Sequence, residues 1–373
     1  MAGMAAEDPT GRIRLLLLFG GRSAEHEVSC VSAAHVLRAL DPARYDVLPV
    51  GITRKGEWVV SEQGQAALGP GAPPPAELTA AGPAVDPLPA LAEGEATGPV
   101  VVFPLLHGPL GEDGTVQGLL EVAGVPYVGS GVLGSAVAMD KAMAKTVLAA
   151  HGIPQGRWFA VRRGVDDRGA ARRAGEELGW PVFVKPANLG SSVGVSRADD
   201  EEAAAAALDL AFAYDEWVVV EEGIAGREIE CSVLGNGPYE ASVPGEVVPS
   251  RDFYDYEDKY VVDGAQLLVP APLDPAVADE VRAMAATAAG ALRVEGMARV
   301  DFFYEEGGRG ILVNEVNTIP GFTPISMYPK LWLASGLTYA DLVDRLVELA
   351  LERHARRAGF RDATHRGPAL PEG

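Results

Sequence analysis

The sequence contains only two cysteines, Cys30 and Cys231, in 373 residues. They are far apart and in no metal-ligand spacing, which argues against a disulfide framework and against a zinc site. No apolar run reaches membrane-spanning length, and residues 1–10 lack the basic and apolar segments of a signal peptide. These absences predict a protein of the reducing cytoplasm.

Basic residues are also few, with 31 Lys and Arg against 52 Asp and Glu and a net charge of -21. This balance opposes binding to nucleic acid or to anionic membrane, so we expect neither as a partner and expect a small substrate. An anionic substrate such as a nucleotide would then need a local basic pocket and a metal. The chain is long enough for two or three domains with substantial cores.

Two nucleotide-binding fingerprints are missing, and no internal repeat is present. Residues 12–19 predict a buried strand, followed by Gly20-Gly21, a helix to about Leu40 and a strand over 45–52. This pattern indicates a βαβ unit of a parallel sheet, but it lacks the third glycine of a dinucleotide fingerprint. A second strand, 180–186, leads into a glycine and serine loop over 187–195, which lacks the Gly-Lys-Ser/Thr ending of a P-loop.

The loop over 187–195 nevertheless suits phosphate. Its small residues let backbone N–H groups approach an anion, the hydroxyls of Ser191 and Ser192 add donors, and Lys185 supplies positive charge. A plain hairpin turn is the alternative.

A β-hairpin is predicted from residues 297–304 and 311–317, with turn residues between them. A loop centred near Gly308 places Asp301 opposite Glu315, and Arg299 opposite Asn317. Facing carboxylates destabilise a sheet unless a cation lies between them, and Asp, Glu and Asn oxygens suit Mg²⁺. The alternative is a solvated face of an edge hairpin.

Other segments carry weaker signals. Residues 61–98 are rich in Ala, Pro and Gly and predict a surface insertion. The strand 100–106 ends in a polar loop containing His107, Glu112 and Asp113, where the two acids could simply cap the next helix. A helix over 135–151 carries Lys141 and Lys145, of which Lys141 could reach a phosphate.

The second half of the chain is predicted to contain a helix over 199–214, strands near 217–222 and 228–234, and an interdomain hinge between those strands. The aromatic and charged segment 249–264 favours a functional lid over a floppy loop. A disordered tail is expected from about Arg361.

Five sequence blocks together resemble the ATP-grasp enzymes, and more closely the D-alanine–D-alanine ligases of bacterial cell-wall synthesis. The blocks are Gly20–Ser29, His107–Thr115, Lys185–Gly194, Tyr256–Tyr260 and Glu315–Pro329. The resemblance covers nearly the whole chain, and residues 61–98 depart from it most. It implies an α/β fold of three domains: an N-terminal Rossmann-like parallel-sheet domain over 12–136, and two α+β domains, 137–222 and 223–361, that sandwich ATP.

The resemblance implies that the carboxylate of one D-alanine attacks the γ-phosphate of ATP, and that the amine of a second D-alanine then displaces phosphate from the acyl phosphate. Such transfer depends on positioning and charge neutralisation. By resemblance, Asp301, Glu315 and Asn317 hold two Mg²⁺ ions, for which Mn²⁺ can substitute. A homodimer is also implied.

Roles for other residues follow from the same resemblance. The residues implied for ATP are Lys141, Lys185, Ser191, Ser192, Glu221, Glu222, Ile224, Glu228, Lys259 and Asn314. Those implied for the amino acids and the chemistry are Glu25, His107, Ser191, Tyr260, Arg299, Gly321, Ser326 and Met327. Glu25 would bind the first ammonium and link to Ser191 and Tyr260, while Arg299 and the Gly321 N–H would stabilise the tetrahedral oxyanion.

Three alternatives stay open at this point. A D-alanine–D-lactate ligase is the nearest, although the presence of Tyr260 and Met327 favours an amine as second nucleophile. The second is an ATP-grasp ligase for another carboxylate. The third is a nucleotide-binding regulatory protein without turnover, against which the joint presence of Glu25, Arg299, Asp301, Glu315 and Asn317 argues.

Overall fold

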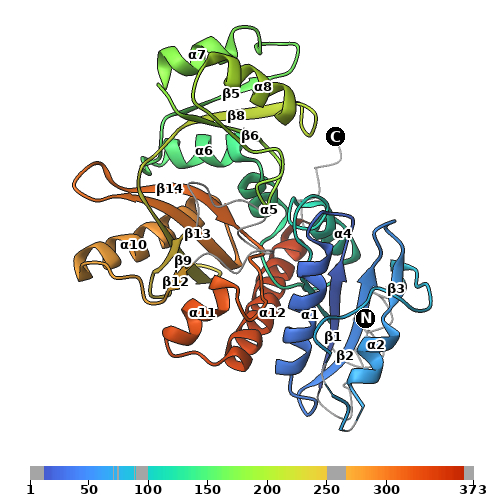
Figure 1. Ribbon diagram of the computed structural model, residues 1–373. Coiled ribbons are helices and arrows are strands. Elements are labelled where there is room, and N and C mark those ends of the chain that lie inside the picture. Colours follow the sequence, from blue (N-terminus) through green and yellow to red (C-terminus); the bar gives the residue numbers. More distant parts are fainter. Residues whose placement is uncertain are drawn as a thin grey trace, which may run out of the picture.

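The computed structural model describes residues 12–69, 71–73, 75–87, 89, 100–249 and 266–364, with backbone only for 361–364. Within these ranges the chain forms three sheets flanked by helices (Figure 1). The predicted α/β fold class is confirmed. No helix of the described part has both the length and the apolar character needed to cross a membrane.

The N-terminal sheet has the strand order β3-β2-β1-β4. Strands β1 (Ile13–Gly20), β2 (Tyr45–Ile52) and β4 (Val100–Pro104) run parallel, and the short β3 (Trp58–Val60) is antiparallel to β2. Residues 15–18 of the central strand β1 are fully buried leucines, as expected for a parallel strand covered on both faces. With α1 (His26–Ala39) as the crossover, the βαβ prediction is confirmed.

The predicted surface insertion over 61–98 is wrong for part of its described length. Ser61 caps α2 (Glu62–Ala67) by accepting the Gly64 N–H at 3.1 Å. Leu78 is 1% exposed, and its N–H donates to the carbonyl of Cys30. Burial of this leucine against α1 is the apolar gain that draws the segment onto the domain core.

The helix predicted over 135–151 is two helices, α5 (Val132–Met139) and α6 (Lys141–Ala150). Asp140 separates them, because its backbone is extended and its side chain accepts the Met143 N–H at 2.9 Å, which makes it the N-cap of α6. The other helix of this region is α4 (Thr115–Ala123).

The central sheet is antiparallel, with strand order β5-β8-β6-β7. Its strands are β5 (Trp158–Arg162), β6 (Val182–Pro186), β7 (Ser196–Ala198) and β8 (Trp217–Glu222), and its helices are α7 (Ala170–Glu177) and α8 (Glu201–Ala211). A separate apolar cluster lies between this sheet and its two helices, so the unit has a core of its own.

The C-terminal sheet is also antiparallel, in the order β12-β11-β9-β13-β14, with β10 beside β9. Its strands are β9 (Arg227–Gly235), β10 (Glu240–Ala241), β11 (Gly245–Val248), β12 (Gln266–Leu268), β13 (Gly296–Glu305) and β14 (Gly310–Asn317). Its helices are α10 (Pro275–Ala291), α11 (Met327–Ala334) and α12 (Tyr339–Thr364). Helix α12 ends at Thr364, slightly beyond the start predicted for a disordered tail, and the rest of that tail lies outside the described residues.

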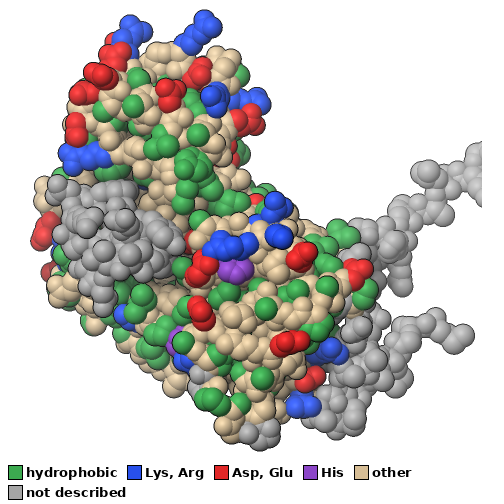
Figure 2. Space-filling view, turned by 45° about the vertical axis from the view of Figure 1, so that its right-hand side comes forward, with side chains coloured by type: hydrophobic (Ala, Val, Ile, Leu, Met, Phe, Trp, Pro, Cys, Tyr) green, Lys and Arg blue, Asp and Glu red, His purple; other side chains and the backbone are tan. Residues whose placement is uncertain are grey.

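The chain passes from the central to the C-terminal sheet between Glu222 and Arg227, where the sequence predicted a hinge. The three domain boundaries themselves stay predictions. On the face shown in Figure 2, acidic and basic side chains are interspersed, with no single basic area covering that face.

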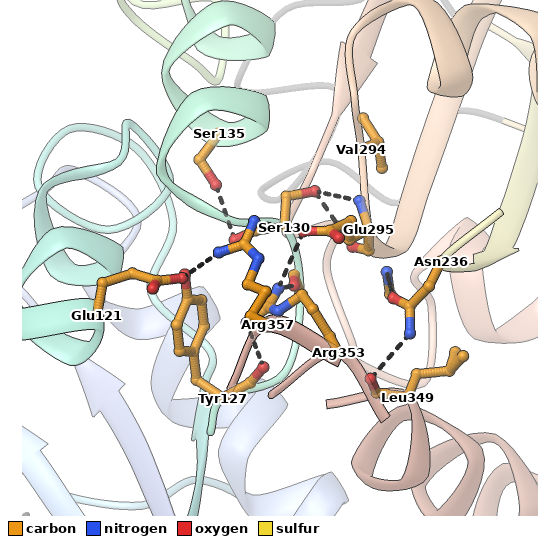
Figure 3. A network of polar contacts seen from close by, with 12 residues as sticks. Glu121, Tyr127, Ser130, Ser135, Asn236, Val294, Glu295, Leu349, Arg353 and Arg357 are labelled. Atoms are coloured by element: carbon orange, nitrogen blue, oxygen red, sulfur yellow. Dashed lines mark hydrogen bonds and ion pairs between the residues drawn. The ribbon is translucent and has the colours of Figure 1, made fainter. Parts of the chain in front are cut away.

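Helix α12 joins the C-terminal part of the chain to the N-terminal sheet (Figure 1). Arg353 of α12 is buried and donates to the carbonyls of Gly129 and of Tyr127, the latter at 2.8 Å. Its guanidinium lies 4.0 Å from the centre of the Tyr127 ring. Figure 3 shows these contacts beside Arg357, which donates to Glu295 at 3.0 Å. This group of residues therefore fixes the start of β13 against the N-terminal domain.

We expect Arg353→Met to lower the free energy of unfolding by about 3 kcal/mol, because two buried carbonyls lose a charged donor. The midpoint of urea denaturation, followed by tryptophan fluorescence, measures the change. Arg345→Met is the control, since Arg345 lies on the same helix, is 43% exposed and pairs with Glu348 only at 3.9 Å. The control should stay within about 0.5 kcal/mol of wild type, and an equally small effect of Arg353→Met would contradict the expectation.

Candidate active site

Two cavities lie next to one another where the three sheets meet. The first, of about 740 Å³ including its open side, is lined by the loops of the N-terminal domain, by the glycine loop and by the end of β14. The second, of about 1660 Å³, lies between the central and C-terminal sheets. Both are lined by Lys141, Leu189, Gly190, Ser191 and Glu315. These shared residues form a common wall.

Glu25 lies just before α1 and lines the first cavity. It is 9% exposed, and its Oε2 is close to the backbones of Gly108 and Gly190: a Cβ built on either glycine would lie 3.4 Å from that oxygen. The N-terminal acid and the glycine loop of the central domain therefore meet here, as the sequence prediction requires.

His107 is buried in the wall of the same cavity. Its Nδ1 lies 3.0 Å from the carbonyl oxygen of Ile319, which can only accept a hydrogen bond, so Nδ1 carries the proton. Burial lowers the pKa of His107 and so favours the neutral ring, although the charge of Glu25 acts in the opposite direction. In the neutral ring Nε2 is an acceptor, and this atom has no hydrogen-bond partner among the described residues.

Glu112 and Asp113 differ in role although they are neighbours. Asp113 accepts the N–H groups of Leu110 and Thr115 at 2.8 and 2.9 Å, which confirms a capping role. Glu112 instead lines the cavity, accepting the Gly108 N–H at 2.7 Å. Burial, together with the nearby charge of Glu25, raises the pKa of Glu112 to about 8.

The β13–β14 hairpin has the predicted register, with Asp301 paired to Glu315 and Arg299 to Asn317. A bulge follows Asp301. Arg299 donates from Nε and Nη2 to the two oxygens of Asp301, both at 2.7 Å. The Asn317 amide donates to Asp301 Oδ2 at 2.9 Å. The sequence prediction missed Glu230 of β9, whose Oε2 lies 3.0 Å from Arg299 Nε.

Arg299 places a positive charge among the carboxylates of this hairpin. Burial acts against its charged form, but Asp301 and Glu230 raise the pKa of Arg299 well above its usual value. The sequence analysis expected a cation between the facing carboxylates Asp301 and Glu315. At Asp301 the guanidinium of Arg299, on the same strand, supplies that positive charge.

The hairpin oxygens fit a hard divalent cation. Asp301 and Glu315 line the second cavity, and Glu315 and Asn317 line the first, so Glu315 lies at the boundary between the other two side chains. Among the described residues, no three His, Cys, Asp or Glu side chains cluster as a metal site. A metal here would use two carboxylates and an amide, with phosphate oxygens and water as its other ligands. Asp301 would have to exchange its contacts with Arg299 for that ion.

Two half-buried lysines, Lys141 and Lys185, line the second cavity, and a third, the buried Lys145, shares the partner of Lys185. Lys185 Nζ lies 2.8 Å from Glu221 Oε2, and Lys145 Nζ lies 3.2 Å from Glu221 Oε1. Burial opposes ionisation of Glu221, but the two lysines lower its pKa to about 2. Lys141 Nζ donates to the Leu189 carbonyl at 2.5 Å, which ties α6 to the glycine loop. Lys145 was not assigned a function from the sequence.

The second cavity is also lined by four residues that were predicted to bind ATP: Glu222, Ile224, Glu228 and Asn314. The carboxylate of Glu222, however, is bonded to Arg157 and Arg309. The Asn314 carbonyl accepts from Lys145 Nζ at 3.4 Å. Because the Glu222 carboxylate is already occupied, only the backbone of this residue can bind the adenine base.

The glycine loop has an unusual backbone at its two serines. Ser191 and Ser192 have φ values of 51° and 57°, the left-handed region that is costly for residues with a Cβ. Both serines line the second cavity. A strained conformation at a cavity wall is consistent with a loop selected for ligand contact.

Of the three residues predicted near the second D-alanine, Gly321 lines a cavity, whereas Ser326 and Met327 line neither. Gly321 lines the first cavity, and a Cβ on it would lie 2.7 Å from Ser326 Oγ. Ser326 Oγ accepts the Thr323 N–H at 3.0 Å. Met327 is 4% exposed in an apolar cluster with Val247 and Leu331, so only its backbone is available to a ligand. Lys259 and Tyr260, with most of the predicted lid, lie outside the described residues.

The residues missed by sequence reasoning are Glu112, Lys145 and Glu230. Glu112 had a usable signal, because it lies in a glycine-rich loop at the end of a parallel strand. Lys145 and Glu230 had none, since each acquires its role from a partner in another element.

Comparisons with known proteins agree with this geometry. The model of the D-ala D-ala ligase N-terminus matches residues 14–130, and that of the D-ala D-ala ligase C-terminus matches residues 147–348. The chain is 48% identical to D-alanine–D-alanine ligase of Solibacter usitatus, covering 93% of this chain and 98% of the relative. It is 46% identical to D-alanine–D-alanine ligase A of Escherichia coli K12, with 92% and 97% covered.

Two solved structures extend the comparison to the fold. The D-alanine-D-alanine ligase from Coxiella burnetii has a TM-score of 0.80 and 36% identity, covering 95% of this chain and 98% of that one. The VanG D-Ala:D-Ser ligase from Enterococcus faecalis has a TM-score of 0.76 and 33% identity, covering 91% and 99%. With both halves matched by family models and near-complete coverage of its relatives, this chain belongs to the D-alanine–D-alanine ligase family, with its ATP-grasp fold.

Proposed function

We propose that this protein joins two D-alanine molecules to D-alanyl-D-alanine, with conversion of ATP to ADP and phosphate, in the synthesis of peptidoglycan precursors. The observation that carries the proposal is the common wall of the two cavities. One cavity presents acceptors suited to an ammonium group, namely Glu25 and His107 Nε2, and the other presents lysines suited to phosphates. Lys141, Ser191 and Glu315 lie at the boundary, where a carboxylate would meet a γ-phosphate.

In the first step Glu25 holds the ammonium of the first D-alanine, and the neutral His107 lies beside it. Lys141 and Lys185 hold the phosphates, with the N–H groups and hydroxyls of Ser191 and Ser192 around them. The carboxylate oxygen of D-alanine bonds to the γ-phosphorus as the bond to the β–γ bridging oxygen breaks. The products are D-alanyl phosphate and ADP.

In the second step the amine of another D-alanine attacks the acyl carbon. Arg299 and the Gly321 N–H lie in the wall of the same cavity, and they stabilise the oxyanion of the tetrahedral intermediate. Phosphate then leaves, and the amine loses a proton. Ser326 and the backbone of Met327 hold the second carboxylate. The family resemblance also implies a link from Glu25 through Ser191 to Tyr260, which lies outside the described residues.

Asp301, Glu315 and Asn317 would hold two Mg²⁺ ions, and Mn²⁺ would substitute. Bound there, the ions would neutralise charge on the transferring phosphoryl group. The adenine would lie against the backbone of Glu221, Glu222 and Ile224, with Glu228 at the ribose. Asn314 would face the nucleotide, and Lys259 would reach the γ-phosphate.

The proposal also covers the cellular location and the oligomeric state of the protein. We propose a cytoplasmic homodimer, supported by the family resemblance and by the cytoplasmic origin of ATP and D-alanine. Light scattering during size-exclusion chromatography measures the oligomeric state.

The metal assignment predicts that Glu315→Gln lowers kcat by at least about 100-fold, because one neutralising oxygen ligand of the phosphoryl-transfer site is lost. D-Alanine-dependent ADP release measures the effect, and Mn²⁺ binding followed by electron paramagnetic resonance reports the site without turnover. Glu306→Gln is the matched control, because Glu306 lies in the turn of the same hairpin and is 72% exposed. Unchanged turnover or unchanged Mn²⁺ binding in Glu315→Gln would refute the assignment.

The choice of second substrate predicts a product ratio. With ATP, Mg²⁺ and equal D-alanine and D-lactate near pH 7, we expect D-alanyl-D-alanine to predominate, since the implied Tyr260 and Met327 pattern favours an amine nucleophile. Mass spectrometry of the products measures the ratio. D-Serine belongs in the same experiment, because a relative at 33% identity is named as a D-Ala:D-Ser ligase. Predominant depsipeptide, or predominant D-alanyl-D-serine at equal concentrations, would overturn the assignment.

A further inference from the structure

A cluster of ion pairs borders the second cavity at Glu222. At its centre is Glu222, the last residue of β8. Arg157, directly before β5, and Arg309, in the turn between β13 and β14, contact it from two different sheets. The cluster therefore joins the central and C-terminal sheets.

The contacts of Glu222 are numerous for one carboxylate. Its Oε1 accepts the Arg157 N–H at 2.7 Å and a hydrogen bond from Arg309 Nη1, and its Oε2 accepts from Arg157 Nε at 2.8 Å. Arg309 is held in turn by Glu305, with Nε to Oε2 at 2.6 Å. The Glu222 side chain is 8% exposed, so its pairs are less screened than surface pairs.

A second link lies directly beside the ion pairs. The Val313 N–H of β14 donates to the Pro154 carbonyl at 2.8 Å, and Gln155 forms a bridge with Val313. Gly156 packs against Ile224, since a Cβ on this glycine would lie 2.7 Å from Ile224 Cδ1. Residues 154–157 thus form a strip between the hairpin and the backbone at 222–224.

That backbone is a wall of the second cavity, which Glu222, Ile224 and Ala225 line. Lys185 and Lys145 pair with the neighbouring Glu221, whose side chain lies on the opposite face of β8 from that of Glu222. If the lysines bind phosphates, the base lies at the end where Arg309 and Glu222 meet. This step rests on the proposed function.

We propose that Arg309 is a positioning residue for ATP: with Arg157, it fixes Glu222 so that the backbone at 222–224 faces the base at a set distance from the hairpin. Arg309 does not touch the nucleotide in this arrangement. It acts by holding the central and C-terminal sheets together beside the adenine. This contact keeps the backbone N–H and C=O groups at the end of β8 in place.

The inference predicts a loss of nucleotide affinity and of base selectivity. In Arg309→Gln, the KM for ATP and the Kd for ADP should rise between about threefold and tenfold, the range expected for a charged hydrogen bond that is partly exposed. The ratio of ATP to GTP turnover should fall, because the base-reading backbone is less fixed. The KM for D-alanine and kcat should change by less than about twofold, since the amino-acid cavity is lined by other residues.

Three further variants separate the positioning role of Arg309 from a general effect of its charge. Arg309→Lys keeps the positive charge and should restore most of the ADP affinity. Arg162→Gln is the matched control, because Arg162 is 45% exposed, against 42% for Arg309, and its partner Glu216 belongs to the same sheet region. In the double variant Arg309→Gln with Glu222→Gln, the ADP affinity should equal that of Glu222→Gln alone, since both changes remove one interaction.

The measurements are titration calorimetry with ADP, and steady-state kinetics with both substrates. Equal effects of Arg309→Gln and Arg162→Gln on ADP affinity would overturn the inference, as would an equal rise in the KM values of ATP and D-alanine. Additive losses in the double variant would also overturn it. Because ADP binding needs no turnover, a wild-type protein that forms no D-alanyl-D-alanine would refute the proposed function, while the ADP titrations still decide on Arg309.

Discussion

The cleft between the central and C-terminal sheets depends on the mutual neutralisation of buried charges. Arg299 is paired with Asp301 and Glu230, and Glu221 is paired with Lys145 and Lys185. A buried charge without such a partner costs several kcal/mol, so these side chains can coexist in a protein interior only as sets. The same groups are the ones proposed to bind metal and phosphates. Under that proposal, ligand binding would exchange ionic partners: Asp301 would give up Arg299, and Lys185 would give up part of its contact with Glu221.

The hairpin shows what sequence reasoning could establish. Alternation along the two strands and the glycine turn were enough to place Asp301 opposite Glu315 and Arg299 opposite Asn317, because a tight turn fixes the register of adjacent strands. The same reasoning assigned an ion as the neutralising cation, whereas the structure supplies Arg299 at Asp301. A local pattern specifies which side chains share a face, but it does not specify which of several close charges will pair.

Contacts between distant segments were beyond the sequence patterns. Glu230 reaches Arg299 only because β9 is the neighbour of β13. The order of strands in an antiparallel sheet has no local signature in the sequence. Leu78 was assigned to a surface insertion because its neighbours are Ala, Pro and Gly, yet one buried leucine holds its segment against α1. The family resemblance went further than the patterns, since it named residues from four blocks that the described structure brings to one pair of cavities.

The three sheets are not joined equally, and this difference bears on how substrates enter. One continuous apolar cluster includes β1, α1 and α12, and Arg353 adds buried hydrogen bonds, so displacing the N-terminal domain from the C-terminal part would expose core. The cluster of the central sheet contains only residues of its own strands and helices. Its links to the hairpin are mostly polar, through Glu222, Arg309 and the strip at 154–157. A rotation of the central sheet therefore exposes less apolar surface than displacement of the N-terminal domain from the C-terminal part. Such a rotation would open the second cavity, which lies between the central and C-terminal sheets.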